Sequence, residues 1–322
     1  MYKKLYLFIG LFILLVSLIS CAKKESESNT SSPSIFKAVG YSGTILSSPD
    51  GITWTSSTWD SQNYGTSKNL SGITYGNSTY VAVGWYSTII SSSDGNTWTE
   101  RNSGSSWDLS GVTYGNSTFV VVGWNGHILT SSEGTTWTSR TSGTALFLSG
   151  VSYGNSTFVA VGGGGVILTS SDGSSWDNRN SGTSCNWRSC SWLSGVGHNG
   201  NKTFVAVGHS GMILTSPDGI TWTEQISGTS NNLAEVVYEN GSFLVVGHSG
   251  TILTSPDGIT WTARSSGTLK NLNGVAYGNI IYVAVGYSGT ILTSPDGITW
   301  TERDSGKSNY LSGVTFLSLI HI

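Results

Sequence analysis

The hydrophobic positions of this chain fall in short runs that repeat along almost its whole length. The repeating unit reads LSGVTYGNSTFVAVGxSGTILTSPDGITWTERxSG, and its runs LSGVTYG, TFVAVG, GTILTS and WTER have the length and residue types of β-strands. Glycine, asparagine and aspartate separate the runs, and these residues tolerate the positive φ angles that tight β-turns need. The pattern predicts four antiparallel strands per unit and almost no helix after residue 21.

A tryptophan marks each copy of the unit, three residues after an Asp-Gly pair or, once, after Glu133-Gly134. We call these segments the Asp-Gly turns. Their tryptophans lie 44, 39, 39, 46, 39 and 39 residues apart, at Trp54, Trp98, Trp137, Trp176, Trp222, Trp261 and Trp300. The unit is therefore 39 residues long, with insertions at two places. Repeated units of four short strands are typical of β-propeller blades.

The two ends of the repeat array predict how it closes. The first copy begins at Phe36 with its second strand, and residues 311–316 repeat the first strand alone. We therefore predict an all-β fold over residues 36–316: a seven-bladed β-propeller of four-stranded antiparallel blades, whose C-terminal strand completes the N-terminal blade. A linear array would leave incomplete sheets at both ends. Residues 317–322 do not continue the unit, and we expect them to be a non-native tail.

The first 35 residues have a different character from the repeats. Lys3 and Lys4 precede an apolar run, residues 5–19, that is short for a membrane span. The sequence Leu-Ile-Ser-Cys at residues 18–21 resembles the lipobox of bacterial lipoproteins. This resemblance implies a signal peptide over residues 1–20 and lipidation of Cys21, followed by a polar, flexible tether over residues 21–35. An ordinary secretory signal is the alternative.

The lipoprotein resemblance also implies a location. Ala22 stands where an aspartate retains some lipoproteins at the inner membrane. We therefore expect a protein of the cell envelope that is held at a membrane by its lipid anchor, with the outer membrane favoured.

The Asp-Gly turns carry a second resemblance. Residues 48–54, SPDGITW, resemble the Asp-box (BNR) repeat of sialidase-like and photosystem-assembly-factor propellers. The likeness extends over residues 36–316. Two departures are that Asp and Gly are adjacent here and that Glu133 replaces one aspartate. The resemblance supports the fold and implies little about activity, because one fold of this kind hosts many functions.

Composition and the placement of charged residues argue against several function classes. Only 10% of residues are charged and the net charge is -3, so no basic field exists to hold nucleic acid. The arginines recur three residues after the repeated tryptophan and cannot converge on one site: Arg101, Arg140, Arg179, Arg264 and Arg303. Asp60, Asp108 and Glu235 lie outside the repeated positions without an evident pairing. We predict no enzyme and no cofactor, with a glycan-active hydrolase as the alternative.

The variable positions predict a ligand-binding face. Alternating strands place the Gly-Asn hairpins and the Asp-Gly turns on one face, and the other turns with the blade-to-blade connections on the opposite face. Aromatic or histidine side chains follow the VAVG strand in six of seven units, at Tyr41, Trp85, Trp124, His209, His248 and Tyr287, with Gly163 as the exception. The two insertions add Trp59, Tyr64, Trp187, Arg188 and Trp192 to this face. Such a surface suits a glycan or a protein; packing of each residue on its own hairpin is the alternative.

Two smaller groups complete the candidates. Cys185 and Cys190 lie in one insertion, and export favours a local disulfide between them over two free thiols. His209 and His248 lie in adjacent units, with His127 on the same face, but they have no acidic partner, so we expect no metal site. The sequence thus predicts a membrane-anchored, monomeric, non-enzymatic binding module, with an envelope assembly or scaffold factor as the alternative.

Overall fold

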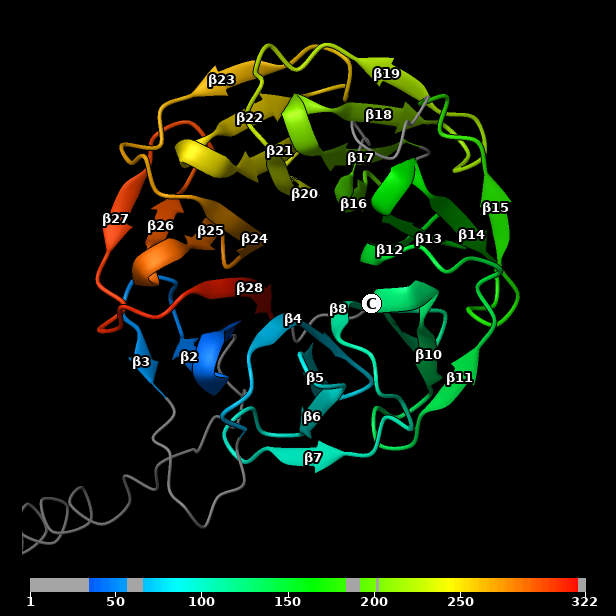
Figure 1. Cartoon of the computed structure of the whole chain (residues 1–322). Coiled ribbons are helices and arrows are strands. Elements are labelled where there is room, and N and C mark those ends of the chain that lie inside the picture. Colours follow the sequence, from blue (N-terminus) through cyan, green and yellow to red (C-terminus); the bar gives the residue numbers. More distant parts are fainter. Residues whose placement is uncertain (1–34, 57–65, 184–191, 201–202, 318–322) are drawn as a thin grey trace, which may run out of the picture. The chain divides into compact units, whose positions relative to one another are not determined.

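The chain forms seven four-stranded antiparallel sheets arranged as the blades of a β-propeller (Figure 1). This computed structural model describes residues 35–56, 66–183, 192–200 and 203–317. Within those residues the only helical segments are six short 3₁₀ turns. The predicted fold class and blade number are confirmed.

The two inner strands of each blade come from LSGVTYG and TFVAVG. The innermost strands, in order from the second blade, are β4 (Leu70–Gly76), β8 (Leu109–Gly115), β12 (Leu148–Gly154), β16 (Leu193–His198), β20 (Leu233–Glu239), β24 (Leu272–Gly278) and β28 (Leu311–Phe316). The strands that follow them outward, starting from the first blade, are β1 (Phe36–Gly40), β5 (Thr79–Gly84), β9 (Thr118–Gly123), β13 (Thr157–Gly162), β17 (Phe204–Gly208), β21 (Ser242–Gly247) and β25 (Ile281–Gly286).

The two outer strands are shorter. The third strands are β2 (Ile45–Ser48), β6 (Thr88–Ser92), β10 (Ile128–Ser131), β14 (Ile167–Ser170), β18 (Ile213–Ser216), β22 (Ile252–Ser255) and β26 (Ile291–Ser294). The outermost are β3 (Thr55–Ser56), β7 (Thr99–Arg101), β11 (Thr138–Arg140), β15 (Asp177–Arg179), β19 (Thr223–Gln225), β23 (Thr262–Arg264) and β27 (Thr301–Arg303). We number the blades from the one that contains β1.

Blade 1 joins the two ends of the repeat array. Its strand order is β28-β1-β2-β3, so the C-terminal strand pairs with the strand that begins the propeller. The register places Phe36 opposite Phe316 and Ala38 opposite Val314. Each innermost strand packs beside the innermost strands of both neighbouring blades, and β28 lies between β24 and β4. The predicted closure by the C-terminal strand is confirmed.

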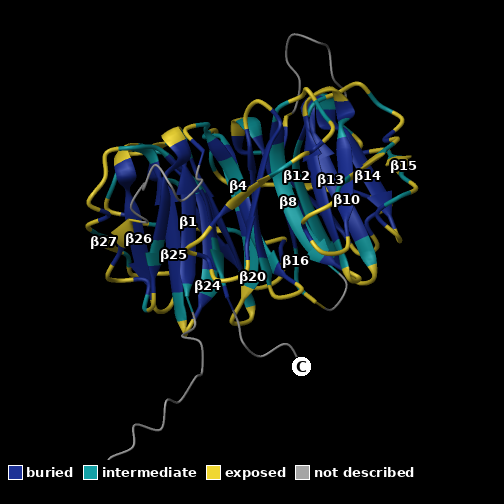
Figure 2. Ribbon diagram, turned by 90° about the horizontal axis from the view of Figure 1, so that it is seen from below, coloured by how far each residue is buried: buried dark blue, intermediate teal, exposed yellow. Residues whose placement is uncertain are grey.

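The ring has two different faces. The hairpins between first and second strands and the Asp-Gly turns lie on one face, which we call the Asp-Gly face. The turns between second and third strands lie on the other with the blade-to-blade connections, and we call it the connector face. Seen from the side, the strands between the faces are largely buried and the exposed residues gather at the two faces (Figure 2).

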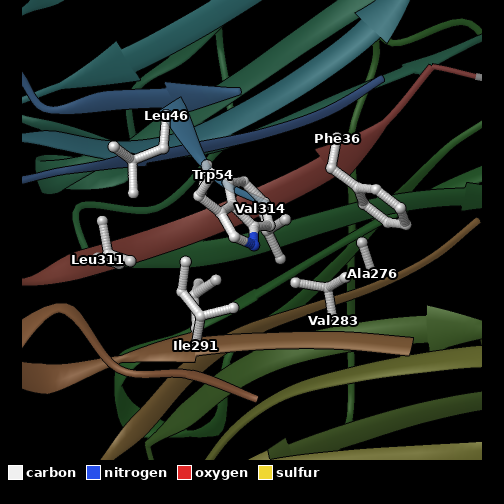
Figure 3. Close-up of a cluster of buried hydrophobic side chains, with 10 residues drawn as sticks. Phe36, Leu46, Trp54, Ala276, Val283, Ile291, Leu311 and Val314 are labelled. Atoms are coloured by element: carbon white, nitrogen blue, oxygen red, sulfur yellow. The ribbon is translucent and has the colours of Figure 1, made fainter. Parts of the chain in front are cut away.

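The hydrophobic core is a set of clusters, each between two adjacent sheets. Between blades 7 and 1, Phe36 and Leu46 contact Val283 and Ile291 across the junction (Figure 3). Trp54 from the first Asp-Gly turn fills the space between the two sheets. Burying one such aromatic side chain contributes about 1.5–3 kcal/mol. The spacing of the repeated tryptophans is therefore a packing requirement of the junctions.

The Asp-Gly turns are stabilised by hydrogen bonds within the turn. In blade 1 an Asp50 oxygen accepts the backbone N–H groups of Ile52 and Thr53, both at 2.8 Å. The Trp54 indole N–H donates to the carbonyl of Gly51 at 2.8 Å. Gly51 has a φ of 75°, where a side chain would be strained. The aspartate carboxylate therefore stabilises the turn by accepting its backbone N–H groups.

Leu317 is the described part of the segment expected to be a tail. Its side chain is buried in the cluster between blades 1 and 2. Its backbone N–H donates to the carbonyl of Ile35 at 2.9 Å, which continues the pairing of β28 with β1. Residues 318–322 lie outside the described residues.

One junction differs from the others because it buries a lysine. Lys37 is fully buried where five of the other blades have valine and one has leucine. Its ammonium group donates to the carbonyl of Gly95 and to the Ser47 hydroxyl, each at 2.6 Å. In blade 2 the Gly95 carbonyl therefore bonds the lysine, and the Trp98 indole N–H has no partner. Burial lowers the pKa of Lys37 from 10.5 to about 8, although Asp94 partly offsets this.

We predict that Lys37→Val stabilises the propeller at neutral pH. The unfolded chain holds the Lys37 proton up to pH 10.5 and the folded chain only to about 8, so the penalty is fully present below pH 8 and fades as the pH rises through that interval. We expect a gain of about 1–3 kcal/mol at pH 7 that has largely disappeared at pH 10. Urea unfolding of both proteins at the two pH values measures this. A variant that is less stable than wild type at pH 7 would contradict it.

Candidate functional site

The candidate face is built on seven equivalent turns. The first residue of each turn donates its backbone N–H to the carbonyl that directly precedes the innermost strand of the same blade, as Trp85 does to Asn69 at 2.9 Å. Six of these turns are 3₁₀ turns: η1 (Tyr41–Gly43), η2 (Trp124–Gly126), η3 (Gly163–Gly165), η4 (His209–Gly211), η5 (His248–Gly250) and η6 (Tyr287–Gly289). The scaffold therefore presents the seven predicted positions in one orientation.

The residue before each innermost strand has one of two roles. In four blades it is Asn or Asp, and its side-chain oxygen accepts the N–H of the second turn residue of the preceding blade: Asn69 from Ser42, Asp108 from Tyr86, Asn232 from Ser210 and Asn271 from Ser249. In the other three it is aromatic, namely Phe147, Trp192 and Tyr310. These aromatic rings contact neighbouring rings instead.

The first aromatic arc crosses the ring closure. Tyr310 lies against Tyr287 of blade 7, with ring centroids 3.5 Å apart, and stacks on Tyr41 of blade 1 at 4.8 Å. Tyr41 then meets Trp85 of blade 2 edge-on at 5.7 Å. Burial and a hydrogen bond with Tyr287 raise the pKa of Tyr310 to about 12, so this phenol stays neutral at physiological pH. Four rings thus form one continuous strip over three blades.

The second aromatic arc runs over blades 3, 4 and 5. Phe147 lies between Trp124 and Trp192, with centroid distances of 5.4 and 5.9 Å. Trp192 stacks on His209 at 5.6 Å with an interplanar angle of 18°. A Cβ on Gly163 would lie 4.0 Å from the Trp192 ring. Gly163 is the exception among the seven positions because it has no aromatic side chain of its own. The Trp192 ring lies beside its turn instead.

Asp108 lies between the two arcs. Its side chain holds the turn of blade 2 through Tyr86, and its carbonyl accepts the N–H of Trp124 in blade 3 at 2.9 Å. Large aromatic side chains around it are exposed: Tyr86 71%, Trp124 51%, Trp107 43% and Trp85 39%. Tyr86 and Trp107 thus lie exposed beside Trp85 of the first arc and Trp124 of the second, and the described residues of blades 2 and 3 form an open aromatic sector of this face.

The structure brings together only some of the predicted site residues. Tyr41, Trp85 and Tyr287 lie in the first arc, and Trp124, Trp192 and His209 in the second. His248 occupies its predicted turn, and its ring contacts no aromatic ring among the described residues. Six further candidates lie outside the described residues: Trp59, Tyr64, Cys185, Trp187, Arg188 and Cys190, as does Cys21.

Four residues of this face were missed by the sequence analysis: Tyr86, Trp107, Phe147 and Tyr310. Phe147 and Tyr310 carry a readable signal, because each stands directly before an LSG strand where other units have Asn or Asp. Tyr86 and Trp107 carry no such signal. Their exposure depends on how the turn and the connection fold.

The remaining polar candidates have structural surroundings. The repeated arginines bond a hydroxyl of the neighbouring third strand, as Arg264 Nε does to Thr254 at 2.8 Å. Burial and the nearby His248 lower the pKa of His209. No group of three or more His, Cys, Asp or Glu side chains that could hold a metal ion occurs among the described residues. Glu235 lines a cavity that the innermost strands form at the centre of the ring, and Asp108 is not part of that lining. Asp60 lies outside the described residues.

Comparisons with known proteins agree with the fold. The family described as the DUF6242 beta propeller domain matches residues 200–311, which is less than half of the chain. No curated protein sequence matches significantly. Within the described residues there is no helix long and apolar enough to cross a membrane.

Several solved structures are similar. YCF48 from Cyanidioschyzon merolae has a TM-score of 0.58 at 17% identity, covering 74% of this chain and 86% of its own. YCF48 bound to D1 peptide has a TM-score of 0.64 at 18% identity, and the match covers 82% of this chain and 87% of the YCF48 chain. The computationally designed Ika8 protein has a TM-score of 0.60 at 12% identity, and the match covers 87% of this chain and 90% of the Ika8 chain. At these identities the likeness shows the fold alone: the protein is a β-propeller.

We predict that Asp108→Ala loosens the blade 2 turn. The change leaves the Tyr86 N–H without its acceptor, which costs about 1 kcal/mol. Asp108→Asn keeps an acceptor of the kind that Asn69, Asn232 and Asn271 provide, so it is the matched control and should lose less than half as much. Urea unfolding measures both. Equal losses would mean that the charge, rather than the hydrogen bond, stabilises this turn.

Proposed function

We propose that this protein is a non-enzymatic binding module whose connector face binds a polypeptide partner. The observation that carries this is the pair of continuous aromatic arcs on the ring, which end in the exposed Trp85 and Trp124 and have the exposed Tyr86 and Trp107 beside them. Exposed aromatic clusters of this size exceed the scattered apolar residues of ordinary surfaces. Tryptophan and tyrosine are also the residues that most often dominate binding energy at protein interfaces.

The charges on this face support an apolar, amide-rich recognition surface. Lys68 and Lys270 are paired with Glu100 and Glu302 of the outermost strands, at 2.9 and 3.3 Å. Asp108 is engaged by a backbone N–H. Lys307, beside the η6 turn, is exposed and has no ion pair among the described residues. Apart from this charge, hydrophobic contact and hydrogen bonding would provide most of the affinity.

The packing of the rings favours a polypeptide over a glycan. Sugar rings bind best to an aromatic face that is open to solvent. Here Tyr41 is stacked on Tyr310 at 20° and Trp192 on His209 at 18°, so neighbouring rings cover part of these faces. The arcs then present ring edges and the grooves between rings, which suit the apolar side chains of a protein. A glycan ligand is the outcome that the binding experiment below has to exclude.

A second candidate is an assembly or scaffold role in the envelope. The specific support is the similar structure of YCF48 bound to D1 peptide, in which a propeller of this fold holds a peptide. An assembly factor and a simple receptor would both bind polypeptide. They differ in the partner, which for an assembly factor is a component of one envelope complex.

The proposal includes attachment to a membrane. Its basis is the lipobox-like sequence that ends at Cys21 and the polar tether of residues 21–35. The described domain begins at Ile35 and Phe36, so the tether would join blade 1 on the Asp-Gly face. We further propose an outer-membrane location, a monomeric state and a disulfide between Cys185 and Cys190.

We predict that Trp85→Ala/Trp124→Ala abolishes partner binding without unfolding the propeller. Two aromatic hot spots contribute about 2 kcal/mol each, so affinity should fall by at least 100-fold. The measurement is a screen of the full chain on arrays of envelope proteins and of glycans, followed by titration of each hit. Ile220→Ala/Ile259→Ala, on the Asp-Gly face with 50% and 58% exposure, is the matched control and should bind normally. Equal binding by all three proteins, or hits on glycans alone, would contradict the proposal.

We predict that Cys21→Ser moves the protein from the membrane fraction to the soluble fraction of expressing cells. Removing the acylated thiol removes the hydrophobic anchor, and the described domain offers no membrane-spanning helix to replace it. Fractionation and intact-mass analysis measure the change. A wild-type protein without added acyl mass would exclude the lipid anchor.

A further inference from the structure

The centre of the ring contains a cavity of about 170 Å³. It is lined by the second to fourth residues of the innermost strands, the Ser-Gly-Val part of each LSGV sequence. These strands pack side by side around the axis of the ring (Figure 1). The cavity that they line is therefore an axial channel, and its lining is mostly polar. Nothing in the proposed function of the connector face uses this channel.

Five of the seven strands line the channel with a Ser-Gly pair. In β12 and β16 the next strand leaves little room for a side chain at the glycine: a Cβ on Gly150 would lie 2.8 Å from the carbonyl oxygen of Ser194, and one on Gly195 2.8 Å from that of Ala234. The pair is kept in β4, β8, β12, β16 and β28. The two strands that depart from it are neighbours, β20 and β24.

These two departures place larger polar side chains on adjacent strands. In β20 the pair is Ala234-Glu235, which places a carboxyl group where the other strands have glycine. In β24 the pair is Asn273-Gly274, and the Asn273 Nδ2 donates to the carbonyl of Leu311 at 2.8 Å. This bond directs the Asn273 side chain toward β28, on the side of β24 away from β20.

The Glu235 carboxyl group has no compensating partner. No hydrogen bond or ion pair to it occurs among the described residues, and no other ionisable side chain lines the cavity there. Protein surrounds the group, and the surface that it exposes belongs to the channel. This burial raises the pKa of Glu235 to about 7, so a large part of the protein carries an unpaired carboxylate at neutral pH. An isolated buried charge is costly unless a counter-charge reaches it.

We propose that the central channel is a cation site, in which the Glu235 carboxylate and nearby serine hydroxyls of the channel lining hold one small cation. The donor set consists of oxygen atoms only, which suits hard metal ions and the N–H groups of a protonated amine. A single carboxylate balances a single positive charge. The remaining cavity volume accommodates the water that completes the shell of the ion.

The chemistry predicts how binding depends on pH. A cation pairs with the ionised carboxylate and displaces its proton, so binding strengthens as the pH rises through 7. The elements packed against β20 are β16, β17, β21, β24 and the η4 turn. Gly195, Val246 and Asn273, which lie next to Glu235 on these strands, do not titrate. The titratable side chains on these elements, His198, His209 and Tyr277, do not line the cavity. Glu235 is therefore the group whose ionisation controls the site.

Thermal unfolding of the full chain in mild detergent tests this proposal. The reference is choline chloride at pH 8, and NaCl, CaCl₂ or methylammonium chloride replaces it at constant ionic strength. We expect at least one of these cations to raise the Tm of wild type by about 2 °C or more at pH 8, and by much less at pH 5.5. Response to sodium or calcium identifies a metal ion, and response to methylammonium alone identifies an amine.

The variants separate the channel from the rest of the protein. Glu235→Gln and Glu235→Gly, the latter restoring the repeated residue, should fold and lose the cation response. Glu239→Gln, at the end of the same strand and outside the channel lining, is the matched control and should keep it. No shift in wild type with any of the three cations, or an equal shift in the Glu235 variants, would overturn the proposal.

Discussion

The pairing of β28 with β1 is the interaction on which the rest of the structure depends. It joins residues 311–316 to residues 36–40, the two ends of the repeat array, and converts a row of blades into a ring. Without it β1 would have an unpaired edge, and the cluster between blades 7 and 1 would lose Leu311 and Val314. The pairing also builds part of the candidate site. Tyr41 donates its N–H to the Tyr310 carbonyl, and Asn309 bonds the Tyr41 carbonyl and the Thr44 hydroxyl, so the first aromatic arc exists only in the closed ring.

The individual chemistry of the protein lies in departures from the repeat. A perfect sevenfold unit would give every junction a valine and every channel position a Ser-Gly pair. Lys37 occupies the valine position of one junction and donates to the Gly95 carbonyl. Glu235 and Asn273 change the channel on two adjacent strands. Phe147, Trp192 and Tyr310 are aromatic where the other four blades have an Asn or Asp that accepts the N–H of a neighbouring turn. Each change replaces a residue that most blades share by a side chain that gives one blade its own contacts.

Much of the fold followed from the sequence because the repeat encodes it redundantly. The strand types and the turn residues indicated seven four-stranded blades. The first copy lacks its first strand and residues 311–316 repeat that strand alone, which indicated a closed ring. The positions of Tyr41, Trp85, Trp124, His209, His248 and Tyr287 followed from register alone. The arcs did not, because they depend on which rings meet across blade junctions, as Phe147 does between Trp124 and Trp192. The burial of Lys37 and the channel position of Glu235 also needed the three-dimensional structure. Sequence reasoning considered Glu235 only as a possible catalytic carboxylate.

Site-specific photocrosslinking in cells tests the central claim, that the connector face is the binding surface, most directly. A benzophenone amino acid would replace Tyr86, between the aromatic arcs, and in a separate protein Ile280 on the Asp-Gly face; the two side chains are similarly exposed, at 71% and 81%. The account predicts one discrete crosslinked polypeptide from position 86 and none from position 280. A crosslinked partner from position 280 with none from position 86 would contradict it.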